Sequence, residues 1–121
     1  MIDTHAHIFT KEFDEDLEQV IERAKAVGVK QILLPNIDLE SYPRMMKVAN
    51  QYPDFCLPMA GIHPCDIKEN YQDFLNQTYQ WLKEGKYIAV GETGIDLYWD
   101  KTFISEQKLA FAQHLRWGKE F

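Results

Sequence analysis

Short apolar stretches alternate with longer segments of helical periodicity along the whole 121-residue chain. The apolar stretches predict four strands, at residues 2–8, 29–34, 55–62 and 87–90. Apolar residues at spacings of three and four predict four helices, at 12–27, 39–51, about 70–84 and from about 103 to the end. Gly28 and Gly85 stand where the first and third helices should end. Strand and helix therefore alternate four times, which predicts parallel strands joined by helical crossovers.

The end of each predicted strand carries a polar residue. These residues are His5 and His7, Asn36, His63 and Glu92. Ligands of parallel α/β folds bind outside the carboxyl ends of the strands, so these groups point to one functional edge. A doubly wound sheet usually has a glycine-rich phosphate loop after its first strand, whereas this strand ends in two histidines. The pattern favours a TIM (β/α) barrel, of which the chain supplies about the first four βα units.

Two short motifs carry candidate metal ligands. Asp3, His5 and His7 alternate along the first predicted strand and therefore share one face. Two neutral imidazoles at this spacing suit one divalent cation, the alternative being a pair of surface histidines. Glu92 lies in Gly91-Glu92-Thr93-Gly94-Ile95-Asp96 after the fourth strand, and is otherwise a turn residue bonded to local backbone N–H groups. We expect the two histidines and Glu92 to lie within metal-ligand reach of one another.

Composition narrows the class of protein. The chain is 45% hydrophobic and 13% aromatic, enough for one globular domain, and nothing in it resembles a linker. We see no secretory signal and no apolar run that could span a membrane, so Cys56 and Cys65 indicate reduced thiols in a cytoplasmic protein. The net charge of −6 argues against a broad basic surface for nucleic acid. A phosphate substrate remains compatible with it, because bound metal ions supply local positive charge.

The sequence resembles the TatD family of metal-dependent deoxyribonucleases, within the amidohydrolase-like TIM barrels. The resemblance rests on three segments, Ile2-Asp3-Thr4-His5-Ala6-His7, Gly61-Ile62-His63-Pro64 and Ala89-Val90-Gly91-Glu92-Thr93-Gly94-Ile95-Asp96. Gln107 and Phe111 also fall where the family has a Gln and a Phe before its fifth strand. The similarity covers essentially the whole chain. It implies that residues 1–121 form the N-terminal half of a single metal-dependent hydrolase barrel domain.

The resemblance also implies a chemistry. His5 and His7 would bind one divalent metal, and Glu92, as a catalytic residue, would bridge it to a second. Nitrogen and oxygen ligands suit Zn, Mn, Co or Ni better than Mg alone, and the sequence does not choose among them. Such a pair of metals suits hydrolysis of phosphodiester bonds in a DNA substrate. His63 would lie beside the substrate phosphate, the alternative being a helix-capping or packing imidazole.

Four further residues are expected near this centre, and three of them have two interpretations. Asp3 should lie in the barrel interior below the metals and support a ligand from behind. Asp96 either orients a ligand in the same way or caps the helix that follows it. Tyr98 and Trp99, on the loop after the fourth strand, either stack on the bases of a single-stranded substrate or cover the protein surface.

Other hypotheses compete with a nuclease. An amidohydrolase-type enzyme acting on C–N bonds shares His5-x-His7, but often has a carboxylated lysine in place of Glu92. A phosphoesterase of the polymerase-and-histidinol-phosphatase type also opens with Asp-x-His-x-His, although the His63 and Glu92 motifs fit TatD better. The third hypothesis is an inactive half-barrel fragment, because the family's later ligands, two histidines and an aspartate, belong to strands that the chain does not reach. We therefore expect the chain alone to be inactive, and to self-associate through its open edges if it is really this short.

Overall fold

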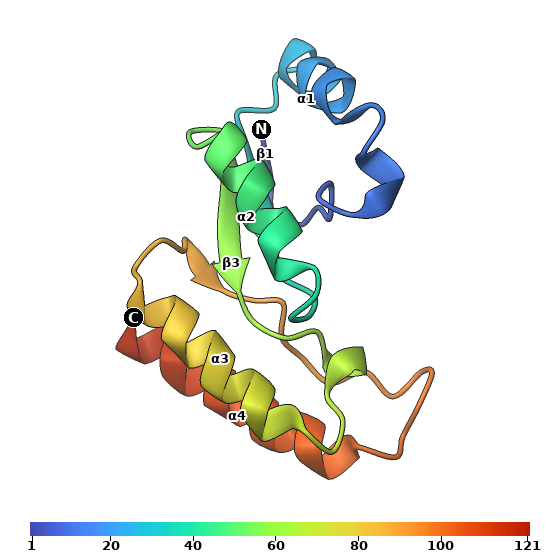
Figure 1. Cartoon of the computed structure of the whole chain (residues 1–121), viewed down its shortest axis with the longest axis vertical. Helices are drawn as coiled ribbons and strands as arrows, with labels where there is room; N and C mark the ends of the chain where they lie inside the picture. The colour runs from blue at the N-terminus through green and yellow to red at the C-terminus, as the bar shows by residue number, and fades with distance from the viewer.

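The computed structural model describes all 121 residues and shows one sheet of parallel strands, each followed by a helix (Figure 1). The strands lie in the order β1–β2–β3–β4, with bounds β1 (Ile2–Asp3), β2 (Gln31–Pro35), β3 (Cys56–Ala60) and β4 (Ala89–Val90). The helices are α1 (Leu17–Ala26), α2 (Tyr42–Gln51), α3 (Tyr71–Lys83) and α4 (Ile104–Glu120). Short 3-10 turns are η1 (Lys11–Phe13) and η2 (Pro64–Asp66). The predicted alternation and parallel pairing are confirmed.

The two faces of the sheet differ in burial, as in one half of a barrel. Ile32 pairs with Cys56, and both are buried in the main core. The neighbouring pair Leu33 and Leu57 points to the opposite face and is only half-buried. This second face corresponds to the barrel interior, where further strands would be needed to cover it.

Two groups of apolar side chains hold the helices on the sheet. The first is a cluster of nine buried residues beneath α1 and α2: Ile8, Phe9, Ile21, Ile32, Leu34, Met45, Val48, Phe55 and Cys56. The second joins α3 and α4 to β3 through Trp81, Leu82, Trp117 and Ala60. Tyr42 of α2 stacks on Trp81 with ring centroids 3.7 Å apart, so the two clusters are continuous. Figure 1 shows α3 and α4 lying side by side.

Local signals in the sequence explain where most helices begin and end. Gly28 and Gly85 adopt φ values of +88° and +70° directly after α1 and α3, the left-handed conformation that favours glycine. Asp38 and Ser41 bond to each other's backbone N–H at 2.7 and 3.0 Å, forming a turn ahead of α2. That turn makes α2 begin at Tyr42, three residues later than predicted.

The predicted first strand, residues 2–8, is too long. β1 ends at Asp3, and only the Ala6 N–H bond to Leu33 O at 3.1 Å continues the contact with β2. The chain then turns away because Ile8 and Phe9 are buried in the main core rather than alternating across a sheet. His5 and His7 therefore lie on the segment that follows the strand, not within it.

The first helix also begins later than predicted, at Leu17 instead of Glu12. Arg44 of α2 donates from Nε to Phe9 O at 2.9 Å and forms an ion pair with Asp14. These contacts hold residues 9–16 against α2 in η1 and turns, so a tertiary contact overrides the helical periodicity there.

Both edges of the sheet and one face of α4 remain uncovered. Ile88, Leu115 and Phe121 are each more than half exposed, beside a hollow of about 750 Å³ between β4 and α4. The β1 edge is exposed as well, with Ile2 half accessible. None of the helices has the length and apolar character that crossing a bilayer requires.

His114 joins α4 to the end of β3, a role that the sequence analysis did not assign. Its Nδ1 donates to Ala110 O at 2.7 Å, and its Nε2 accepts the Ile62 N–H at 3.2 Å. The ring is buried, on the stripe that Gln107, Ala110 and Trp117 also form. That helical spacing was the signal in the sequence that could have placed it in the core.

Acid should destabilise the fold through His114. Burial lowers the pKa of His114 below its ordinary value of 6.5, with the Ala110 carbonyl opposing. His114 therefore binds a proton more readily in the unfolded state than in the folded state. The contribution of the neutral ring to folding stability is complete above about pH 6.5 and is lost as the pH falls below that value. Thermal unfolding between pH 7.5 and 5 should show a steeper loss of Tm for the wild type than for His114→Gln, which retains a donor and an acceptor. Parallel curves for the two proteins would contradict this role.

Candidate metal centre

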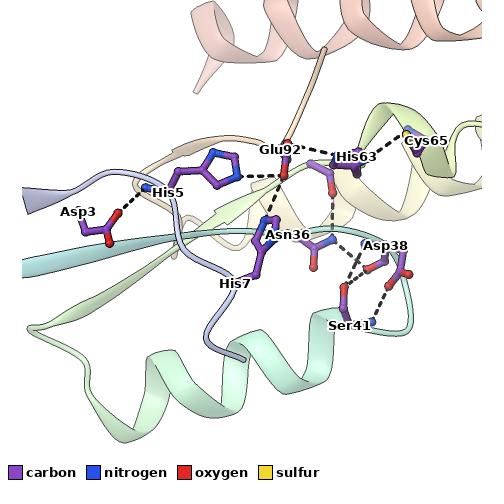
Figure 2. A network of polar contacts seen from close by, with 10 residues as sticks. Asp3, His5, His7, Asn36, Asp38, Ser41, His63, Cys65 and Glu92 are labelled. Atoms are coloured by element: carbon purple, nitrogen blue, oxygen red, sulfur yellow. Dashed lines mark hydrogen bonds and ion pairs between the residues drawn. The ribbon is translucent and has the colours of Figure 1, made fainter. Parts of the chain in front are cut away.

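Three side chains meet beyond the carboxyl ends of β1 and β4. His5 Nε2 and His7 Nε2 lie 3.2 and 3.1 Å from the same carboxylate oxygen, Oε2 of Glu92. The ligand atoms of all three residues lie within 4.8 Å of one another. Figure 2 shows both rings directed at the carboxylate, His5 from the left of the view and His7 from below. The structure thus brings together the residues expected to meet here.

Two polar atoms of this cluster lack hydrogen-bond partners. His7 Nε2 and Glu92 Oε2 are both buried and unpaired by hydrogen-bond geometry, although they face each other. Buried polar atoms without partners carry a cost of about 1–3 kcal/mol each unless a ligand satisfies them. Two imidazole nitrogens and a carboxylate oxygen form a donor set that suits a divalent transition metal. The residues present therefore fit a metal ion.

The state of His7 also suits a ligand. Burial lowers the pKa of His7 below its ordinary value, the neighbouring His5 acts in the same direction, and Glu92 opposes them. The ring is therefore neutral at neutral pH, which is the form that binds metal. His5 is more accessible, with 54% of its side chain exposed against 30% for His7.

Close backbone contacts fix Glu92. The Gly91 N–H donates to Ala60 O at 2.9 Å, which extends the β3–β4 pairing by one residue. Gly61 then packs directly on the next peptide, since a Cβ at Gly61 would lie 2.5 Å from both Glu92 O and Gly91 C. Only glycine permits this approach. The glycines of the two sequence motifs are thus what bring their side chains together.

His63 approaches the same carboxylate from the other side (Figure 2). Its Nε2 lies 3.4 Å from Glu92 Oε1, and its Nδ1 accepts the Cys65 N–H at 3.1 Å, capping η2. Because Nδ1 is an acceptor, the proton of the neutral ring is on Nε2. His63 therefore presents a hydrogen-bond donor to the cluster rather than a metal-binding lone pair. The capping alternative raised from the sequence describes one nitrogen of this ring.

The two aspartates are not in contact with the ligand rings. Asp3 is exposed near the open edge and accepts the backbone N–H of His5 at 3.1 Å. Asp96 accepts the N–H of Tyr98 at 2.9 Å, which makes a turn in the loop before α4. The side-chain amide of Gln107 bonds both the N–H and the C=O of Asp96, at 2.9 and 3.0 Å. These contacts order the backbone next to the cluster.

The two aromatic side chains on the β4–α4 loop are exposed to solvent rather than packed on the protein. Tyr98 and Trp99 are 81% and 80% exposed, and their rings meet edge to face at 4.7 Å. Their exposure disfavours the packing alternative, because a packing ring would be covered.

Asn36, noted only as a polar residue at a strand end, is fully buried and contacts the backbone around Glu92. No local pattern identifies this role, because the contact joins residues far apart in sequence.

The fold and the cluster together define a class: a parallel (β/α) half-barrel with a candidate metal centre at the carboxyl ends of its strands. The model of the family described as TatD related DNase matches residues 2–121. The chain belongs to the TatD family, and the family resemblance inferred from the sequence is confirmed.

Relatives and solved structures agree with this assignment. The chain is 37% identical to a protein of Bacillus subtilis named as an uncharacterized metal-dependent hydrolase, YabD, over 99% of this chain and 47% of that protein. It is 32% identical to the 3'-5' ssDNA/RNA exonuclease TatD of Pectobacterium parmentieri, over 95% and 44% respectively. The crystal structure of the Escherichia coli TatD homologue YjjV superposes with a TM-score of 0.88 at 30% identity, over 99% of this chain and 47% of that one. The chain thus spans about half the length of the relatives it matches.

Proposed function

We propose that this chain carries the first half of the active site of a metal-dependent deoxyribonuclease. The observation that carries the proposal is the cluster of His5, His7 and Glu92, in which His7 Nε2 and Glu92 Oε2 are buried without hydrogen-bond partners. Membership of the TatD family supports a divalent metal and a nucleic-acid substrate. The whole of residues 1–121 would then be the N-terminal half of one barrel domain.

In this proposal His5, His7 and Glu92 would hold one divalent ion, which supplies Lewis acidity and positive charge when bound. The positive charge answers the objection that the chain is acidic overall. Glu92 would also serve a second ion. Its other oxygen, Oε1, lies 3.4 Å from His63 Nε2, which presents a donor and not a metal ligand, so the second ion would need further ligands from outside this chain. Zn, Mn, Co, Ni and Mg all remain candidates.

His63 binds the substrate in the proposed reaction. Cys65 holds the ring so that the Nε2 proton points into the cluster. A donor in this position suits a non-bridging phosphate oxygen, whose negative charge strengthens the hydrogen bond. Asp3 supports the His5 backbone, and Asp96 shapes the loop that carries the aromatic pair.

Two assays separate this function from its rivals. Cleavage of a single-stranded oligonucleotide and of a cyclic amide should each be measured for the 121-residue chain and for the complete enzyme, in metal-free buffer and with Zn²⁺ or Mn²⁺. Metal-dependent phosphodiester cleavage supports the nuclease, whereas amide hydrolysis would favour a C–N hydrolase. Metal binding without either activity would favour the half-barrel fragment.

The uncovered β4 edge supports a further part of the proposal, that the 121-residue chain self-associates. Unpaired strand edges and apolar patches of this kind recruit another chain.

We also propose a reducing compartment such as the cytoplasm, because Cys56 and Cys65 are free thiols in the structure.

Replacing Trp99 should weaken binding of single-stranded DNA. If the exposed Trp99 ring stacks on a base, Trp99→Ala should cost about 1–3 kcal/mol of binding free energy, the range for one base–aromatic stack. Fluorescence titration with a labelled oligonucleotide measures it. Hydrolysis of a small phosphodiester without a base is the control and should barely change. Equal losses on both substrates would indicate a folding defect instead.

A further inference from the structure

Asn36, the residue directly after β2, is completely buried at the carboxyl end of the sheet. We propose that Asn36 is a positioning residue that holds the Glu92 peptide, and through it the Glu92 carboxylate, in the orientation that binds metal. The inference rests on the proposed metal centre. It assigns to β2 a part in the site that neither sequence motif includes.

The backbone of Asn36 forms hydrogen bonds to residues beyond the neighbouring strand β3. β3 lies between β2 and β4, yet Asn36 C=O accepts the Glu92 N–H at 3.0 Å. The Asn36 N–H lies 3.2 Å from both Met59 O of β3 and Gly91 O. The ends of three strands are thereby joined at one residue. The peptide that carries the Glu92 side chain is bonded to Asn36 at its nitrogen.

The side chain of Asn36 supports the Glu92 backbone from a second direction, through Gly61. Its Nδ2 donates to Gly61 O at 2.9 Å and to Asp38 O at 3.0 Å, which uses both amide protons (Figure 2). Gly61 is the residue whose backbone packs directly on Glu92 O. Asn36 therefore fixes both the hydrogen-bond partner of the Glu92 N–H and the surface against which the Glu92 carbonyl rests.

Only the donor half of the amide is used. Asn36 Oδ1 is buried and has no partner. A side chain of similar volume without donors would leave Gly61 O and Asp38 O unpaired, whereas losing Oδ1 removes no bond. The proposed role thus predicts a dependence on donors at this position rather than on volume alone.

Metal affinity tests the proposal in the 121-residue chain, with Co²⁺ as the probe. Asn36→Leu keeps the volume and removes both donors, and Asn36→Ser restores one. Dissociation constants come from calorimetry and from the visible absorption of bound Co²⁺, which also reports ligand geometry. Asn36→Leu should raise the dissociation constant by about 10- to 100-fold, the usual effect of removing a group that orients a ligand. Asn36→Ser should recover part of the loss. Asn50→Leu, at an exposed position in α2, is the matched control and should leave the constant unchanged.

A double-mutant cycle with Glu92→Ala separates positioning from general packing. In the Glu92→Ala background the His5–His7 pair still binds Co²⁺ weakly, and Asn36→Leu should then change the constant less than twofold. Equal losses in both backgrounds, or no loss in either, would overturn the positioning role. A wild-type chain that binds no Co²⁺ would overturn the metal centre itself. If far-UV circular dichroism shows that Asn36→Leu is unfolded, Asn36→Ser is carried through the same cycle, and equal losses in its two backgrounds would overturn the role as well.

Discussion

Glu92→Ala should abolish tight metal binding, with a dissociation constant raised by more than about 100-fold. The expectation exceeds the 10- to 100-fold loss typical of residues that only orient a ligand, because Glu92 Oε2 is the atom that both histidines face. Zn²⁺ titration calorimetry measures the change in the 121-residue chain. In the complete enzyme, Glu92→Ala and His5→Ala should each abolish metal-dependent nuclease activity and leave the fold intact.

Glu69→Ala is the control for that experiment, since Glu69 is an exposed carboxylate that has no bond to the cluster. It should bind Zn²⁺ as the wild type does. Unchanged affinity in Glu92→Ala, or full activity in both enzyme variants, would show that this cluster is not the active site.

A single charge on the uncovered face of α4 should convert an associating chain into a monomer. Light scattering should find the wild type as a dimer or a larger species, because β4 and the apolar hollow beside it need a covering surface. Leu115→Glu places a charge in that hollow and should give a monomer with little metal affinity lost. Leu109→Glu is the matched control, since Leu109 is equally exposed on α4 but faces the groove against α3. A wild-type chain that is already a stable monomer, with tight two-metal binding and full nuclease activity, would contradict the half-barrel prediction.

Periodicity and turn residues were enough to predict the architecture. The alternation of apolar stretches and helical patterns gives the four βα units, and Gly28 and Gly85 mark two helix ends correctly. The errors lie where tertiary contacts override local pattern. Ile8 and Phe9 are apolar enough for a strand, but the core they fill lies beneath α1 and α2. The Arg44 contacts that delay α1 join residues about 30 positions apart, beyond the reach of any window.

For the candidate site, too, the sequence predicted some residues and missed others. His5, His7 and Glu92 were foreseen because each lies at the carboxyl end of a predicted parallel strand, and such ends converge at one edge. The partners of the site were not foreseen. Asn36 reaches Glu92 across 56 positions of sequence, and His114 reaches Ile62 across 52. Which nitrogen of His63 carries the proton also depends on a backbone N–H that only the folded turn η2 presents.

The paired hydrogen bonds between Gln107 and the backbone of Asp96 anchor one end of the β4–α4 loop. An amide side chain that bonds both the N–H and the C=O of one residue imitates a neighbouring strand, and it anchors the loop on the first turns of α4. Residues 97–102 lie beyond that anchor, at the surface. Their length and sequence can therefore change over evolution, or in a designed library, while α4 and the Glu92 motif keep their places. In the proposed nuclease, changes in that segment would alter contacts to the substrate without altering the residues proposed for the chemistry.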